Sequence, residues 1–385
     1  MIISYGARNY FSFKDGFDIS FELNSKVPKA ISKGKRISNV LGIKGANGSG
    51  KTYLLKCLEF IASFTTRSFQ RPEGQFIHVA SFFDNTDPIE FYIDLNLEGI
   101  IYTYELSCTD ESVIREAIYK KVARKTLIVE RINNEIKKKN SDLAVLDSIR
   151  LKKNASIIDT VIQYKLNADI QDFERIHKFL DEVTGNVSSL AVMDDHSFYS
   201  LKDATDFYSK IPSSFQFTKD LIRKCDTGVT DIALTKRTDE KGEEKYFPVF
   251  NHGSADKPRW LTAHSQSDGT MALYRRLAAY WRALTFGGVL VMDEFDTNLH
   301  PDILPMIINL FTNPESNPKS AQFIFTSHNL EIIDHLGKYR TVLVAKVDGE
   351  SFCYRLDEIP GDIIRNDRSI SSLYRDGKLG GVPEL

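Results

Sequence analysis

The chain has 385 residues, of which 42% are hydrophobic and 26% are charged, as in an ordinary globular protein of one to three domains. Its net charge of −2 excludes a global basic field of the kind that announces a nucleic-acid-binding protein. The four cysteines lie far apart and form no C-x-x-C pair, which argues against a zinc site or a disulfide framework. No apolar stretch approaches the roughly 20 residues of a membrane span, and the N-terminus lacks a signal-peptide pattern. We therefore expect a cytoplasmic protein without membrane contact.

Two segments in the first third of the chain alternate apolar and polar side chains. The first is residues 1–25, with Asp15-Gly16 as its turn, and the second is residues 76–106, around Glu98-Gly99. A period of two residues around an Asp-Gly or Glu-Gly pair is typical of a β-hairpin. The sequence therefore predicts two β-hairpins.

Between these hairpins, residues 45–52 match the phosphate-binding loop G-x-x-x-x-G-K-[ST] in full. A short apolar run, 40–43, precedes the loop, and an amphipathic segment, 53–61, follows it, as the strand–loop–helix context requires. Backbone N–H groups of such a loop and the helix N-terminus bind phosphate oxygens. We expect Lys51 to reach the β- and γ-phosphates and Thr52 to bind Mg²⁺. The predicted nucleotide contacts are Gly45, Asn47, Gly48, Ser49, Gly50, Lys51 and Thr52.

Residues 110–225 differ in composition from the segments on either side. Lysine and arginine rise, glycine nearly vanishes, and apolar residues such as Ile157, Val161 and Tyr164 recur at helical spacing. This predicts a mainly helical insertion. For Lys137-Lys138-Lys139 within it, the pattern favours a solvated helix face over a nucleic-acid contact.

Residues 287–294 form an apolar strand that ends in Asp293 and Glu294, which is a Walker B pattern. We expect Asp293 to join the Mg²⁺ shell opposite Thr52 and Glu294 to polarise the attacking water. A Ser267-Asp268-Gly269 turn, beginning 26 residues before Asp293, opens a helix, although this sequence also caps ordinary helices.

A further apolar strand, 321–326, ends in Ser327-His328, and Leu299-His300-Pro301 lies between it and Glu294. No glutamine occupies a clear Q-loop position, and Gln75 is the available candidate. We expect His300 to be structural or to lie at a dimer seam.

The order of these motifs resembles the ABC/SMC-type ATPase head, as in RecF and related repair ATPases. In that class Ser267 and Gly269 would contact the γ-phosphate bound by the opposite protomer, and His328 would be the switch histidine that senses it. The resemblance implies an α/β fold, an ABC-type P-loop NTPase head with a mixed sheet and an antiparallel β subdomain. The catalytic residues would be Glu294, His328 and Lys51. The predicted domains are 1–108 and 229–385, the two halves of the head, and 109–228, the helical insertion.

Finer patterns resemble AAA-annotated, ABC-like ATPases of bacterial anti-phage and abortive-infection systems, of the RloA type, the AbiL type and the PARIS ATPase subunit. The matching segments lie along nearly the whole chain: Arg8–Phe13, Leu151–Ala155, Thr230–Ile232, Ser267–Thr270, Asn366–Tyr374 and Gly377–Pro383. Gln266 and Met271-Ala272 depart from the family pattern, so contacts at these positions do not carry over. The resemblance implies ATP and Mg²⁺, a homo-oligomer formed through the heads, and a separately encoded effector such as a TOPRIM/RloB-like nuclease. A phage protein or DNA would be the trigger.

Two other functions compete with a defence ATPase. One is a RecF/SMC-like DNA repair or maintenance ATPase that binds DNA, which should show a basic groove and strongly salt-dependent binding. The other is an OLD-type nuclease, which needs a C-terminal TOPRIM domain. The 57 residues after His328 are too few for such a domain.

Overall fold

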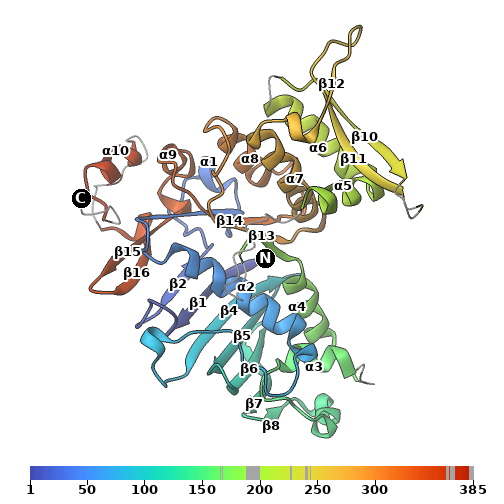
Figure 1. Cartoon of the computed structure of the whole chain (residues 1–385). Helices are drawn as coiled ribbons and strands as arrows, with labels where there is room; N and C mark the ends of the chain where they lie inside the picture. The colour runs from blue at the N-terminus through green and yellow to red at the C-terminus, as the bar shows by residue number, and fades with distance from the viewer. Residues whose placement is uncertain are drawn as a thin grey trace.

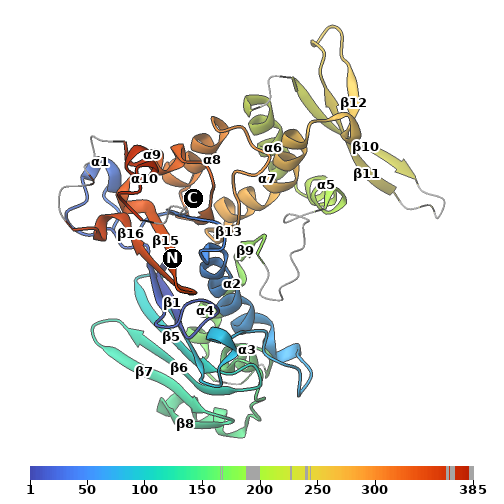
Figure 2. The same cartoon turned by 60° about the vertical axis from the view of Figure 1, so that its left-hand side comes forward.

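The computed structural model describes residues 1–385 except 165, 167, 188–199, 226–227, 239–241, 243, 361–363, 365–368 and 381–385. Within the described residues the strands form three sheets, and helices separate and cover them (Figures 1 and 2). The helices are α1 (Lys29–Ser32), α2 (Lys51–Arg67), α3 (Ile157–Tyr164), α4 (Gln171–Asp181), α5 (Leu201–Lys210), α6 (Pro212–Cys225), α7 (Asp268–Phe286), α8 (Ile303–Thr312), α9 (Glu331–Leu336) and α10 (Ile370–Arg375). In this part of the chain, no helix is long and apolar enough to cross a membrane.

A six-stranded sheet carries the predicted motifs. Its order is β16 (Glu350–Arg355), β15 (Thr341–Val347), β3 (Val40–Gly45), β14 (Gln322–Thr326), β13 (Val289–Met292) and β9 (Val183–Gly185), and only the edge strand β16 runs antiparallel. Every residue of β3, β13 and β14 is buried, as expected for parallel strands covered on both faces. One strand, β14, separates the loop strand β3 from the Walker B strand β13. The carboxyl ends of all three therefore meet at one edge, where α/β sheets bind ligands.

Helix α2 follows the glycine loop and lies between the six-stranded sheet and a second, antiparallel sheet (Figure 1). It touches β3, β13 and β14 on one side and β1 (Ile2–Arg8) and β4 (Ile89–Leu97) on the other. Its less buried positions, such as Lys56 and Glu59, lie on one face and its buried apolar residues on the others, so the helix is amphipathic with a wide apolar face. Leu54, Leu58 and Phe60 are fully buried and join both sheets in one core.

The other face of the six-stranded sheet is covered by α7 and α8. Alternate residues of β13 point to opposite faces, so Val289 and Val291 belong to the core around α2, whereas Leu290 and Met292 belong to a second core. Helices α5 and α6 extend this second core, and a three-stranded sheet projects beyond them (Figures 1 and 2). That sheet has the order β10 (Asp231–Thr238), β11 (Glu244–Asn251) and β12 (Trp260–Thr262).

The antiparallel sheet confirms both predicted hairpins. β1 pairs with β2 (Phe17–Ser20), and β4 pairs with β5 (Ile100–Cys108). In β4 every second residue is buried and those between are not, because one face packs on the core.

The prediction of a mainly helical insertion from residue 109 is wrong for its first part. β6 (Val113–Lys121), β7 (Lys125–Ile132) and β8 (Glu135–Lys139) continue the antiparallel sheet, and helices begin only at α3. Lys137, Lys138 and Lys139 lie on β8, the edge strand, where charged side chains discourage pairing with another chain. The sheet thus continues across residue 108, and the division into 1–108, 109–228 and 229–385 stays a prediction.

Candidate nucleotide-binding site

The glycine loop connects the end of β3 to the start of α2. Gly48 and Gly50 have φ angles of +75° and +106°, a region that side chains rarely adopt. At Gly45 an added Cβ would lie 2.3 Å from the carbonyl oxygen of Val344 on the neighbouring strand. The glycines of the motif are therefore required by turn geometry and by close packing.

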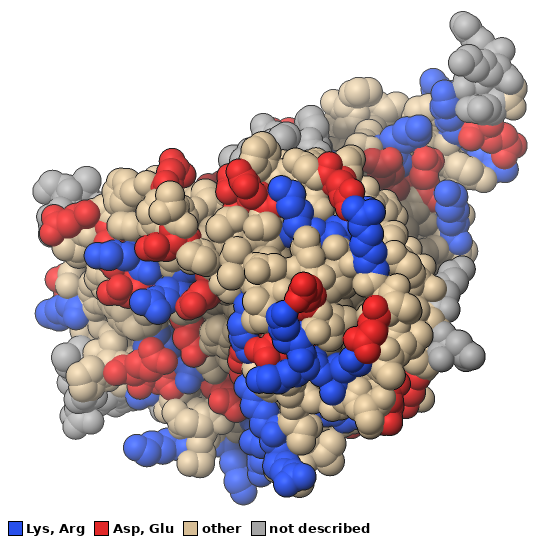
Figure 3. All heavy atoms as spheres, turned by 90° about the horizontal axis from the view of Figure 1, so that it is seen from below, with Lys and Arg blue, Asp and Glu red and all other residues tan. Residues whose placement is uncertain are grey.

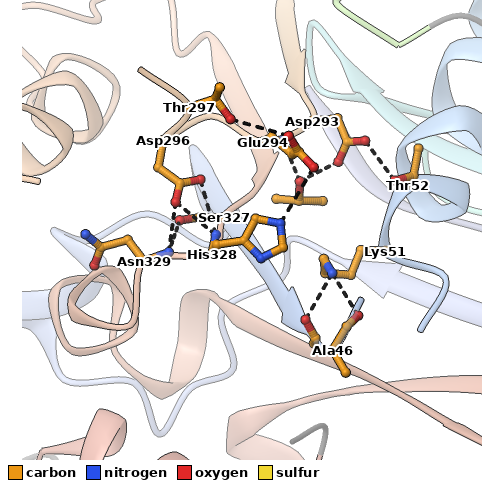
Figure 4. A network of polar contacts seen from close by, with 12 residues as sticks. Ala46, Lys51, Thr52, Asp293, Glu294, Asp296, Thr297, Ser327, His328 and Asn329 are labelled. Atoms are coloured by element: carbon orange, nitrogen blue, oxygen red, sulfur yellow. Dashed lines mark hydrogen bonds and ion pairs between the residues drawn. The ribbon is translucent and has the colours of Figure 1, made fainter. Parts of the chain in front are cut away.

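Two polar side chains of the loop are suited to phosphate. Lys51 is 8% exposed, and its Nζ donates to the carbonyl oxygens of Gly45 at 3.0 Å and Ala46 at 2.9 Å (Figure 4). Burial lowers the pKa of Lys51, and the nearby Asp293 and Glu294 carboxylates partly offset that effect. The Ser49 hydroxyl is buried without a hydrogen-bond partner. A buried hydroxyl without a hydrogen-bond partner destabilises a folded protein. The position of the Ser49 hydroxyl in this loop therefore suits it to donate to a bound phosphate oxygen.

Thr52 and Asp293 lie together, as the sequence predicts. Thr52 Oγ1 donates to Asp293 Oδ2 at 2.7 Å, and Thr326 Oγ1, at the end of β14, donates to the other carboxylate oxygen. A hydroxyl and a carboxylate in this arrangement are hard oxygen ligands of the kind that Mg²⁺ prefers. The residues present therefore fit the implied ion, with Thr52 and Asp293 as the groups that would hold it.

Asn186 supports this pair and was missed by sequence reasoning. Its Nδ2 donates to the Asp293 carbonyl at 2.9 Å, and its Oδ1 accepts from the Asp293 amide at 2.7 Å. It follows β9, a strand of only three residues with no periodic pattern to signal it. Only the parallel pairing of β9 with β13 brings it to the site.

Glu294 and His328, the predicted catalytic pair, face each other across the site. His328 Nε2 lies 3.7 Å from Glu294 Oε1, and both side chains are about half exposed. Glu294 has a φ of +49°, a strained conformation for a residue other than glycine, and such residues cluster at functional sites. Its amide donates to Thr326 Oγ1 at 2.7 Å, which fixes the turn after β13.

The predicted signature residues lie at the start of α7. Ser267 caps the helix by accepting from the Thr270 amide at 3.1 Å, and a Cβ at Gly269 would lie 3.0 Å from the carbonyl oxygen of Asn298. Within the described residues, neither Ser267 nor Gly269 hydrogen bonds to residues 45–52. The structure thus brings together Lys51, Thr52, Asp293, Glu294 and His328, but not Ser267 and Gly269.

Gln75 and His300, the remaining candidates, are both exposed on the surface. Gln75 is exposed, and its backbone carbonyl accepts from Asn154, so its Q-loop role stays a prediction. The His300 side chain is 70% exposed and pairs with Asp302. The tail segments 366–368 and 381–383 lie outside the described residues.

Fold and site define the class of protein. The chain is a P-loop ATPase, in which the loop, the Walker B acids and a histidine meet at the ends of three parallel strands. The family model described as "AAA domain, putative AbiEii toxin, Type IV TA system" matches residues 40–334, and the chain belongs to this family. Members of this class use ATP and typically Mg²⁺.

Two further comparisons were made, with solved structures and with curated proteins. An SMC head domain from Thermotoga maritima is similar at 14% identity with a TM-score of 0.45, covering 92% of this chain and 98% of that one. A search of the curated proteins finds no match.

Proposed function

We propose that this ATPase is the sensor or regulator subunit of a bacterial anti-phage defence system and controls a separately encoded effector, such as a TOPRIM/RloB-like nuclease. Two observations support the proposal. The motif pattern resembles the RloA, AbiL and PARIS ATPases, and the description of the matching family names a toxin of a toxin–antitoxin system. A phage protein or DNA would then be the trigger.

The observation that carries the mechanism is that the predicted site residues lie in two separate places. Lys51, Thr52, Asp293, Glu294 and His328 form one part, whereas Ser267 is exposed at the start of α7. A second protomer that presents its Ser267 and Gly269 would complete the site. Association and release of two heads would then act as a switch, since a ligand that contacts only the closed state shifts the equilibrium toward it.

Each residue has a defined task in this scheme. Glu294 would accept a proton from the attacking water, and His328, 3.7 Å from it, would contact the γ-phosphate as the switch histidine. Lys51 would donate to the β- and γ-phosphate oxygens. Bound Mg²⁺ supplies charge neutralisation on those oxygens.

A DNA repair or maintenance ATPase is the second candidate, and one observation favours it. Residues 113–139 carry nine Lys and Arg against three Glu. The view from below, the side on which β7 and β8 lie, shows Lys and Arg gathered with Asp and Glu among them (Figure 3). Many of these cations are already paired, for example Lys125 with Glu105 at 3.6 Å and Lys139 with Asp147 at 2.7 Å. Pairing weakens the field available to a phosphate backbone.

Head association is tested with Glu294→Gln, which should retain Mg-ATP without hydrolysing it. Light scattering after gel filtration should show a dimer or larger assembly with Mg-ATP and a monomer without it. Adding Ser267→Arg should abolish association. Ser213→Arg, an exposed serine in the first turn of α6, is the matched control and should leave association intact. A protein that stays monomeric with Mg-ATP in the Glu294→Gln background contradicts a site shared between protomers.

The defence role is tested by plaque assays on cells that carry this chain together with its neighbouring genes. Phage plating should fall with the wild-type chain and recover with Lys51→Ala. If protection is absent and the purified protein instead binds duplex DNA with a steep salt dependence, the second candidate is favoured.

A further inference from the structure

Lys44 is a buried cation beside the nucleotide site that belongs to none of the recognised motifs. It lies on β3, directly before Gly45, and is 6% exposed. Its Nζ donates to the backbone carbonyl oxygen of His328. An ammonium group is costly to bury, and an apolar residue would serve the interior of a parallel sheet at lower cost. The residue therefore calls for an explanation other than packing.

The backbone of His328 is held from two sides by opposite charges. The carboxylate of Asp296 accepts from the amides of His328 at 3.0 Å and Asn329 at 2.9 Å (Figure 4). Lys44 holds the carbonyl oxygen of the same residue. With amide and carbonyl both fixed, the imidazole has little freedom except rotation about its own side-chain bonds. It faces Glu294 in that position.

We propose that Lys44 is a positioning residue which, together with Asp296, fixes the backbone of His328 so that the imidazole faces Glu294, and which connects this loop to the C-terminal helix α10. The inference rests on the proposed role of His328 in ATP turnover. It adds a residue that acts through His328 and a route by which another part of the chain can influence the site.

The route to α10 has two contacts. Lys44 Nζ lies 6.0 Å from the centre of the Tyr374 ring on α10, within the range of a cation–π contact. Asp334, on the helix that follows His328, accepts from the Ile370 amide at 2.5 Å and from Ser371 Oγ at 2.6 Å, which anchors the start of α10. A partner that displaces α10 would therefore disturb the histidine loop through Lys44 and through α9.

The charge state of Lys44 should make both stability and turnover depend on pH. Burial lowers the pKa of Lys44 to about 8 from 10.5, Asp296 acts in the opposite direction, and the Lys51 ammonium lowers it further. The Tyr374 ring and the His328 carbonyl also face it. Between pH 8 and 10.5 the unfolded chain binds more protons at this site than the folded one, so Lys44 makes stability rise with pH across that window. Turnover should move in the other direction, because the ammonium that holds the loop loses its charge.

The experiment compares Lys44→Met with Lys44→Arg, which keeps the charge, and with Lys346→Met, an exposed lysine of the adjacent strand β15. Lys44→Met should lower kcat about 10- to 100-fold, the usual consequence of a misplaced catalytic group. It should change KM for ATP little and leave the melting temperature of the nucleotide-free protein no lower, because burial of the ammonium, which lowers the pKa of Lys44, is costly and Met removes that cost. Lys44→Arg should recover part of kcat, and Lys346→Met should match the wild type.

Three results would overturn the assignment. One is a wild-type kcat for Lys44→Met, and another is a fall in kcat accompanied by a matching loss of stability, which indicates a structural role. The third is that nucleotide-free wild type and Lys44→Met show the same pH dependence of unfolding. Turnover that is insensitive to Lys51→Ala would instead remove the proposed ATPase function itself. For the link to α10, Tyr374→Leu should lower kcat and Tyr374→Phe, which keeps the ring, should not; equal activities would remove that link.

Discussion

Two regions of the molecule gather charged groups, and they differ in how far the chain itself compensates those charges. Beneath the antiparallel sheet, Arg131 and Glu116 are fully buried and lie 3.3 Å apart. Arg131 also donates to the carbonyl oxygens of Ala155 at 2.7 Å, Lys152 at 3.0 Å and Asn133 at 2.8 Å. Both charges are thus compensated within the chain.

The nucleotide site is less complete. Ser49 Oγ is buried without a partner, and Glu294 and His328 are about half exposed and 3.7 Å apart. A saturated polar network fixes a structure, whereas donors and acceptors left available in a fixed frame are ready for a ligand. The comparison separates charges that hold the fold from charges kept for chemistry, and it can be tested by exchanging residues in each region.

The largest effect is expected at Glu294. Glu294→Gln removes the general base but keeps size and polarity, so turnover should fall about 10²- to 10⁴-fold while ATP binding persists. Phosphate release measures turnover, and fluorescence of a labelled nucleotide measures binding. Glu331→Gln, an exposed acid at the start of α9, is the control and should behave as wild type. Near-normal turnover in Glu294→Gln would mean that another group activates the water.

The opposite pattern is expected at Glu116. Glu116→Ala leaves the Arg131 charge buried without its partner, which should lower the free energy of unfolding by about 3–5 kcal/mol in urea titrations. Turnover per folded molecule should be unchanged. Glu135→Ala, which removes an exposed acid of β8, should leave the free energy of unfolding close to that of the wild type. A loss of turnover in Glu116→Ala without a loss of stability would break the division between the two regions.

The nucleotide site could be predicted where its signals are local. Glycine placement, Lys51 and Thr52 occupy eight consecutive residues, and Asp293 and His328 each end an apolar strand. Parallel strands bring such ends to one edge, so motif order was sufficient to place them together.

Strands β6, β7 and β8 could not be recognised in the same way. Register shifts occur between Ile118 and Tyr119 and between Glu130 and Arg131, and each shift interrupts the period of two that identifies a strand. The lysines of β8 then resembled a helix surface.

The roles of Asn186 and Lys44 could not be predicted from the sequence for another reason. Their contacts join residues 107 and 284 positions apart, to Asp293 and His328 respectively. Such contacts follow from the packing of the sheet and leave no motif along the chain.

The smallest effect is expected at Asn186, and it sharpens the comparison most. Asn186→Ala removes both hydrogen bonds to the Asp293 backbone without touching the carboxylate, so Asp293 should hold Mg²⁺ less firmly. Loss of such a supporting contact typically costs 10- to 100-fold in metal affinity or activity, and we expect the lower end, about tenfold, in the Mg²⁺ concentration for half-maximal turnover. Measuring turnover at increasing Mg²⁺ concentrations gives this half-maximal concentration for wild type and variant.

Asn154 provides the matched control. It is a fully buried asparagine whose Nδ2 donates to two carbonyl oxygens, Pro72 at 2.8 Å and Gln75 at 2.9 Å, as Asn186 contacts the backbone of Asp293. Asn154→Ala should lower the melting temperature and leave the Mg²⁺ dependence unchanged, because it contacts the backbone of Pro72 and Gln75 and not that of Asp293. If both asparagine variants shift stability alone, the amide of Asn186 only holds β9 to β13, and the nucleotide site ends at Thr326 on that side.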